Sequence, residues 1–338
     1  MGAVPPASSR DKGYDWVKGF LVAAMVVYHA MNVVTTASEE AYGYVRFVSG
    51  SFIFVTGLLL SRHVSAGFDR DPSGTTIKLV LRGFKLVTLF TVLNIAIQAS
   101  GFGNSAKADR GVAGFLAQAA AVYLRGDGTI ASFVILLPIG YLLIVAPFFL
   151  RVAGPGRAAK SVALLSATLL AGGLPQGGLG SSVAEFMVIG VAGLCVGALL
   201  PNRAPAGKGW AKAVMAVAGL AASVWLTAQL YFNLALYAVC VALVIHFAYV
   251  WARQIDLDRA SGQWVVLLGR CSLFGYIAQI VLIQFAARAL GRPQWPLGVQ
   301  AMLFMALILV LLLVACRGLE HARQRFSRVD RAYRWVFA

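Results

Sequence analysis

The sequence predicts an all-α protein, a polytopic transmembrane helix bundle of about ten spans in a single membrane domain. The chain is 59% hydrophobic and only 12% charged, whereas soluble domains contain about 25% charged residues. Apolar runs close to twenty residues long recur along its 338 residues, and a helix needs about twenty to cross a bilayer. The net charge of +16 comes largely from cations at the ends of these runs. We therefore expect membrane lipids, and no nucleic acid, as partners.

The apolar runs divide the chain into a short N-terminal tail at 1–14, a membrane domain at 15–317 and a basic C-terminal tail at 318–338. Each run is long enough, or nearly long enough, to form one membrane helix. The predicted spans are 15–36, 43–62, 76–99, 130–151, 158–172, 181–200, 210–228, 232–251, 264–290 and 297–317.

Two of these spans, and one segment between spans, carry additional local signals. The span at 158–172 is short and runs into AGGLPQGG, so we expect it to be tilted or broken. Residues 112–124 are too few to cross the membrane and predict an interfacial or re-entrant helix. In the sixth span, the spacing of Gly193 and Gly197 permits a close contact between helix backbones.

The distribution of charge orients the predicted bundle. Most Lys and Arg residues lie in alternate loops and in the segment after Cys316. The opposite loops are poor in cations, and one of them contains Glu39 and Glu40. The positive-inside rule then places both termini in the cytoplasm, which agrees with an even number of spans.

Two ionisable residues in the first apolar run, Lys18 and His29, are the strongest functional signal in the sequence. They are about three helical turns apart, so they share one helix face with about 16 Å between them. Lys18 is near a helix end and can extend toward the membrane surface. His29 is deeper, where a histidine either forms a hydrogen bond between helices as a neutral group or performs acid–base chemistry.

Three cations in the third span, Lys78, Arg82 and Lys85, share one face of a helix because they follow i, i+4, i+7 spacing. Like charges on one face repel each other unless an anion compensates them. They either reach lipid headgroups or bind a phosphate-rich ligand that enters from the cytoplasm.

The ninth span, LLGRCSLFGYIAQIVLIQF, contains several polar residues within an apolar sequence. Gln279 is at membrane depth and needs a hydrogen-bonding partner. No metal site is expected, because the four cysteines form no CxxC pair. The candidate polar residues of this span are Arg270, Ser272, Tyr276 and Gln279.

Three of these stretches resemble the membrane-bound acyltransferases of the acyltransferase 3 type. The first span has Asp15, Lys18 and Gly19 in a D-x-x-K-G pattern, with ten residues between Lys18 and His29; the family has Arg or Lys, ten residues and His. FIFVTGLLLS resembles a second-helix segment of the family, and LLGRCSLFGYIAQIVLIQ resembles a late helix in which Gln279 stands at a usual histidine. OpgC-like and heparan glucosaminide acetyltransferase-like enzymes share similar elements.

The resemblance implies transfer of an acyl group from cytoplasmic acyl-CoA to a hydroxyl group of a cell-envelope glycan or lipid. The donor would be acetyl-CoA or succinyl-CoA, used as a co-substrate, with no permanently bound cofactor. His29 would be the general base or, in a variant of the reaction, would form a covalent acyl-histidine, and Lys18 would bind CoA or stabilise charge. Location in the bacterial inner (plasma) membrane as a multi-pass protein is also implied. The residues expected to bind substrates are Asp15, Lys78, Arg82, Lys85, Arg270, Ser272, Tyr276 and Gln279.

Two other functions are compatible with ten spans and buried polar groups. One is a transporter or flippase for a lipid-linked glycan, although the sequence has no inverted repeat of the transporter kind. The other is a non-catalytic subunit of a larger membrane complex. The glycine-lined helix faces would also allow a homodimer.

Overall fold

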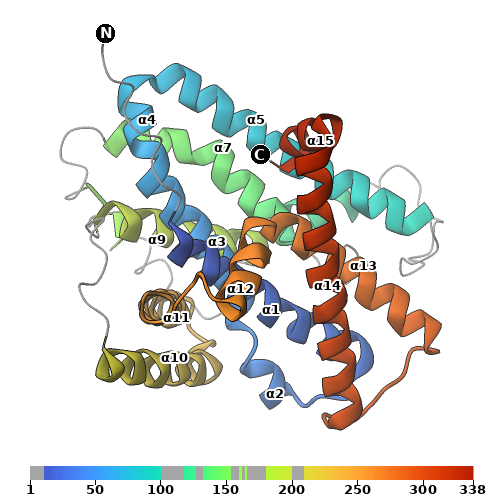
Figure 1. Cartoon of the computed structure of the whole chain (residues 1–338). Coiled ribbons are helices and arrows are strands. Elements are labelled where there is room, and N and C mark those ends of the chain that lie inside the picture. The colour runs from blue at the N-terminus through green and yellow to red at the C-terminus, as the bar shows by residue number, and fades with distance from the viewer. Residues whose placement is uncertain are drawn as a thin grey trace. The chain divides into compact units, whose positions relative to one another are not determined.

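The protein is all-α in the computed structural model, which describes residues 11–99, 118–126, 132–153, 160–161, 164–165, 180–199 and 209–337 (Figure 1). The described residues form helices and no strand, apart from an isolated bridge between Thr35 and Trp295. The predicted fold class is therefore confirmed. The elements are α1 (Lys12–Val34), α2 (Glu39–Gly43), α3 (Phe47–Leu59), η1 (Leu60–Val64), α4 (Ser65–Arg70), α5 (Pro72–Ala99), η2 (Ala121–Arg125), α7 (Leu136–Ala153), α9 (Ser182–Leu199), α10 (Trp210–Leu230), α11 (Leu234–Gln254), α12 (Ala260–Arg270), α13 (Ser272–Ala289), α14 (Val299–Arg325) and α15 (Ser327–Phe337).

Eight segments of the described chain are long and apolar enough to cross a membrane. Seven of them coincide with predicted spans, and Ser272–Ala289 covers only the later part of the predicted span at 264–290. The predicted span at 130–151 corresponds to the shorter apolar helix Leu136–Arg151. The span at 158–172 lies mostly outside the described residues. Of the helix expected at 112–124, residues 118–124 are described and helical.

The ninth predicted span is not one continuous helix over 264–290, and that expectation is wrong. The chain turns at Cys271, whose backbone angles (φ −99°, ψ 21°) end α12 and precede α13. The turn allows the two helices to pack against α1 separately, because α12 contacts α1 at Gly19 and α13 contacts it at Val22. Apolar periodicity alone does not reveal such a break, since both sides of it are apolar.

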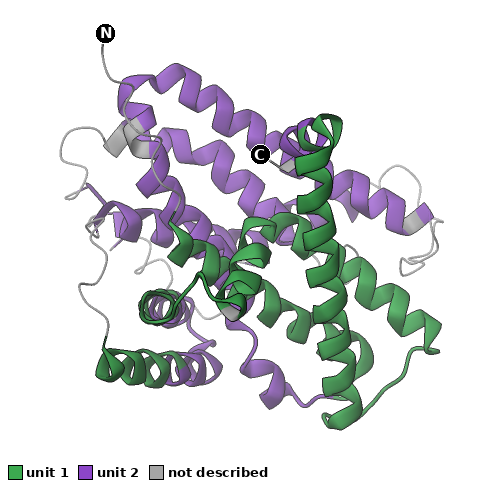
Figure 2. Ribbon diagram, viewed as in Figure 1, with its two compact units in different colours: residues 1–36, 204–220, 245–330 green, residues 37–203, 221–244, 331–338 purple. Residues whose placement is uncertain are grey.

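The chain divides into two compact units (Figure 2). Unit 1 comprises residues 1–36, 204–220 and 245–330, and unit 2 comprises residues 37–203, 221–244 and 331–338. Unit 1 therefore contains α1, α12, α13 and α14, whereas unit 2 contains α3, α5, α7 and α9. Each of α10 and α11 contributes one part to each unit.

Within unit 2, glycines allow the helices to approach each other backbone to backbone. A methyl group at Gly57 would collide with the carbonyl oxygen of Gly190, and one at Gly193 would collide with that of Phe54. At Gly197 it would lie 2.5 Å from the carbonyl oxygen of Leu58. The close contact predicted for Gly193 and Gly197 is therefore confirmed, as the contact between α9 and α3.

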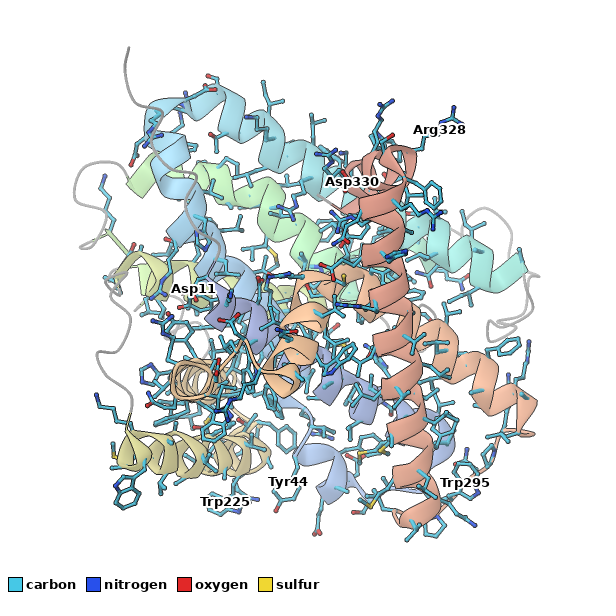
Figure 3. All side chains as sticks on the ribbon, viewed as in Figure 1. Asp11, Tyr44, Trp225, Trp295, Arg328 and Asp330 are labelled. Carbon is cyan, nitrogen blue, oxygen red and sulfur yellow. The ribbon has the colours of Figure 1, made fainter. Side chains whose placement is uncertain are left out.

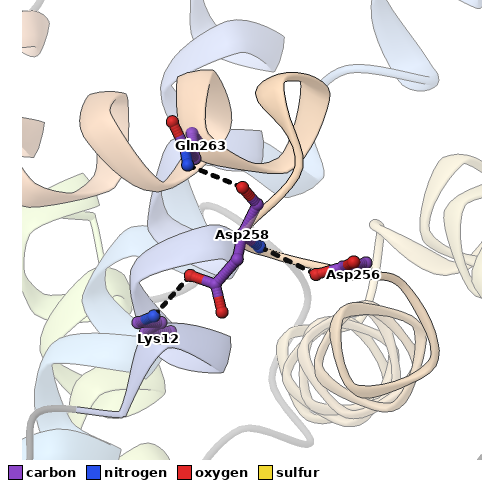
Figure 4. A network of polar contacts seen from close by, with 4 residues as sticks. All are labelled: Lys12, Asp256, Asp258 and Gln263. Carbon is purple, nitrogen blue, oxygen red and sulfur yellow. Dashed lines mark hydrogen bonds and ion pairs between the residues drawn. The ribbon is translucent and has the colours of Figure 1, made fainter.

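Within unit 1, the N-terminal end of α1 is fixed by side chains. Asp11, labelled in Figure 3, caps the helix by accepting a hydrogen bond from the backbone N–H of Gly13 at 2.8 Å. Asp11 also accepts one from the hydroxyl of Tyr249 at 2.9 Å. Lys12 forms an ion pair with Asp258 at 2.6 Å, in the loop that leads into α12 (Figure 4). These contacts attach the start of α1 to Tyr249 of α11 and to the loop before α12.

The C-terminal end of α1 is fixed by the loop between α13 and α14. The backbone N–H of Trp295 donates to the carbonyl of Val34 at 2.8 Å, and the carbonyl of Trp295 accepts from the N–H of Thr36 at 3.0 Å. The amide of Gln294 donates to the carbonyl of Val33 at 3.3 Å. Because both ends are attached within unit 1, α1 can hold its polar side chains in fixed positions.

Candidate functional site

Lys18, near the N-terminal end of α1, forms an ion pair with a residue of the same helix. Lys18 Nζ lies 2.8 Å from Asp15 Oδ1, one helical turn earlier. Asp15 is only 2% exposed and the Lys18 side chain is 20% exposed. A carboxylate this deeply buried needs a compensating charge, which Lys18 provides. The sequence predicts both as site residues, and the structure adds the ion pair between them.

Two glycines bring α12 against this ion pair. A methyl group at Gly269 would collide with the carbonyl oxygen of Asp15, and one at Gly19 would collide with that of Val265. The helices therefore meet with no side chain between their backbones. Arg270 follows Gly269 directly, so its backbone lies beside that of the Asp15–Lys18 turn. Its guanidinium, 43% exposed, is 3.7 Å from the carboxylate of Glu320 on α14.

The imidazole of His29 lies on α1 beside an aromatic residue of α13. Its ring centroid is 6.1 Å from that of Tyr276, with the planes tilted by 48°, and 5.3 Å from that of Tyr28. His29 is half-buried, whereas Tyr276 is buried. In the part of the chain that the structure describes, no residue forms a hydrogen bond with the imidazole, so it is not an interhelical hydrogen-bonding group there. Its nitrogens remain available to a proton-bearing ligand.

Gln279 lies on the same helix as Tyr276, one turn further along. Its side chain is 0% exposed, and neither its amide nitrogen nor its amide oxygen has a hydrogen-bond partner among the described residues. Ser272 is half-buried at the start of α13. Unit 1 thus contains every predicted site residue except the three cations of the third span.

The three cations Lys78, Arg82 and Lys85 belong to unit 2. They lie on α5, and all three side chains are exposed. Lys85 Nζ is 5.7 Å from the centroid of the Trp335 ring, a cation–π distance. The helix packs closely against α7 elsewhere, since a methyl group at Gly83 would lie 2.5 Å from the carbonyl oxygen of Gly140. The shared cationic face predicted for these residues is therefore present on an exposed side of α5.

Sequence reasoning misses two neighbours of the site. Glu320, the partner of Arg270, falls in the predicted C-terminal tail because the apolar run ends before it, whereas α14 continues to Arg325. Tyr28 precedes His29 and places its ring edge-on to the imidazole. No spacing in the sequence pairs Glu320 with Arg270, because the two residues lie on different helices.

These features define the class of protein. The chain has repeated apolar helices, and they carry an ion pair, a half-buried histidine and an unpaired amide at membrane depth. This combination is typical of a multi-pass α-helical membrane protein with a polar site inside the bundle. Comparison with known families then identifies the family to which the chain belongs. The profile of the acyltransferase 3 family, described as an acyltransferase domain, matches residues 11–316. The chain therefore belongs to this family and is a membrane acyltransferase.

The other comparisons add no relative. Neither the curated proteins nor the solved structures include a match to this chain. The matched region begins at Asp11, the N-cap of α1, and ends at Cys316 in α14, so it includes both helices that carry His29 and Gln279.

Proposed function

We propose that the protein transfers an acetyl or succinyl group from acyl-CoA to a hydroxyl group of a cell-envelope glycan or lipid, at the bacterial inner membrane. Membership of the acyltransferase 3 family supports acyl transfer in general. One observation carries the more specific proposal. His29 lies at membrane depth, is half-buried, and has no hydrogen bond to any described residue. An imidazole in that state can accept a proton from a bound hydroxyl group.

The proposed reaction is a direct transfer with His29 as general base. The acceptor oxygen attacks the carbonyl carbon of the thioester while the imidazole takes the hydroxyl proton. The resulting tetrahedral intermediate breaks its carbon–sulfur bond and releases the CoA sulfur, which receives the proton back from the imidazolium. The products are an ester on the acceptor and CoA with a free thiol.

Lys18 would supply positive charge to the acyl donor. Its ammonium group is held by Asp15 and retains 20% exposure, so a bound anion can still reach it. It is about 16 Å along the helix from His29, which matches an extended donor with its thioester at one end and its phosphates toward the other. Arg270, whose side chain is 43% exposed, is a further candidate cation for the donor in unit 1.

Lys78, Arg82 and Lys85 are proposed as further ligands for CoA phosphates at the cytoplasmic side. The charge of the sequence supports this orientation, since most cations lie in alternate loops. Lys and Arg side chains bind phosphate groups through charge-assisted hydrogen bonds. Their exposure on α5 leaves all three accessible to a ligand.

Mass spectrometry of envelope glycans and lipids tests the proposal. Cells that lack the gene should lose one acylated species, separated by the mass of an acetyl or succinyl group from its unmodified form. The gene should restore that species, whereas a copy carrying His29→Ala should not. An unchanged set of acylated envelope molecules in cells without the gene would contradict the proposal.

A further inference from the structure

Gln279 is an unusual residue in this protein because its polar side chain is completely buried and unpaired. It is 0% exposed, and both Nε2 and Oε1 lack a hydrogen-bond partner among the described residues. Buried amides in native proteins nearly always have partners, because removing them from water without compensation is unfavourable. An exception inside a candidate site indicates a group that a ligand satisfies.

The position of Gln279 on α13 directs it toward α1. Gly275, four residues earlier, faces α1, because a methyl group there would lie 3.2 Å from Val22 Cγ1. Tyr276, three residues earlier, faces His29. Residues three and four apart lie on the same face of a helix. Gln279 therefore shares the face of α13 that contacts α1, one turn from the tyrosine beside the proposed base.

We propose that Gln279 is a catalytic residue whose amide N–H donates a hydrogen bond to the thioester carbonyl oxygen of the acyl donor. This inference rests on the proposed function. When the acceptor oxygen bonds to the carbonyl carbon, the carbonyl π electrons move onto oxygen, and negative charge develops there. A preorganised donor in a water-poor site stabilises that charge more than it stabilises the ground-state carbonyl. Oε1 of the same amide accepts a hydrogen bond from an N–H or O–H group of the bound substrates.

The negative charge on the carbonyl oxygen is then transferred to the CoA sulfur as the tetrahedral intermediate breaks down. The oxyanion re-forms the carbonyl double bond, the carbon–sulfur bond breaks, and the thiolate of CoA takes the proton that His29 removed from the acceptor. Gln279 remains neutral and unchanged throughout. Its contribution should therefore appear in turnover and not in the affinity for CoA, because CoA without its acyl group has no thioester carbonyl.

The test compares Gln279→Met with wild type, both purified in detergent and supplied with an envelope extract as the source of acceptor hydroxyl groups. Methionine is similar in length and apolar, so it removes both hydrogen-bonding atoms while filling the site. We expect turnover of acetyl-CoA to fall about 100-fold, with the dissociation constant for CoA within twofold of wild type. We also expect an equal or higher melting temperature, since an unpaired buried amide has been removed.

Two further variants complete the design. Gln279→His retains an N–H donor and should retain turnover within about tenfold of wild type. Ser51→Ala is the matched control, because Ser51 Oγ on α3 of unit 2 is also buried without a partner. Removal of that atom should leave turnover unchanged.

The possible outcomes separate this inference from the proposed function. Wild-type turnover in Gln279→Met would overturn the role of Gln279 while leaving acyl transfer intact. If a rise in the CoA dissociation constant accounts for the lost turnover, Gln279 serves to bind the donor. If a fall in melting temperature accounts for the lost turnover, Gln279 has a structural role. Either result overturns the proposal. If Gln279→Met does not fold, the comparison of Gln279→His with Gln279→Leu gives the same decision. Absence of turnover in wild type would instead reject the proposed function.

Discussion

Asp15 and Lys18 form an ion pair inside the first membrane helix, with Lys18 Nζ 2.8 Å from Asp15 Oδ1. The carboxylate is 2% exposed, so the pair is fixed at the contact between α1 and α12. The same helix carries His29 three turns further on, beside Tyr276. One helix, attached at both ends, therefore places a cation and a candidate base at a fixed separation.

Asp15→Asn should destabilise the protein by on the order of 3 kcal/mol, because it leaves the partly buried Lys18 without its counter-charge. Thermal unfolding in detergent, followed by circular dichroism, measures the effect. The double variant Asp15→Asn/Lys18→Met removes both charges and should recover much of that stability, but it should not recover turnover. If Asp15→Asn is as stable as wild type, the ion pair does not stabilise the fold.

Gly269→Ala should disrupt the contact between α12 and α1, because the added methyl group would collide with the carbonyl oxygen of Asp15. We expect a loss of about 1–3 kcal/mol in stability, together with reduced turnover. Gly318→Ala is the matched control in α14, where no atom lies within 4 Å of the added carbon. It should be neutral or stabilising by up to about 1 kcal/mol. Equal behaviour of the two variants would argue against the close packing.

Arg82→Glu should raise the Michaelis constant for acyl-CoA more than it lowers turnover, since a carboxylate would repel the phosphates of the donor. The effect should weaken as salt concentration rises, because Arg82 is exposed and the interaction is screened. Steady-state kinetics at two ionic strengths measure it. Arg151→Glu, an exposed cation at the end of α7, is the control and should change neither constant. An unchanged Michaelis constant in Arg82→Glu would remove it from the donor site.

Much of the fold follows from the sequence, because long apolar runs have few alternatives to membrane helices. Seven predicted spans match described helices, and the span at 264–290 is matched only in its later part. The break at Cys271 escapes prediction because the sequence on both sides of it is apolar, and only the packing of α12 and α13 against α1 requires a turn there. Helix boundaries near charged residues are also difficult to predict, as the continuation of α14 to Arg325 shows.

The candidate site is predictable in part. The spacing of Lys18 and His29 fixes their common helix face, and the polar residues of the ninth span lie in the same unit. The role of Asp15 as the partner of Lys18 requires coordinates, because several acidic residues could have served. The unpaired state of Gln279 also requires them, since a sequence shows that an amide is buried at membrane depth but not whether a partner faces it.

The central claim is that His29 performs the chemistry, and release of CoA from acetyl-CoA by the purified protein tests it most directly. A thiol reagent measures free CoA in wild type, His29→Ala and His246→Ala, each supplied with an envelope extract as the source of acceptor hydroxyl groups. His246 is the control because it lies in another apolar helix, α11, and is exposed. We expect His29→Ala to remain folded and to release CoA at least about 100-fold more slowly, while His246→Ala matches wild type. Wild-type CoA release by folded His29→Ala would contradict the account.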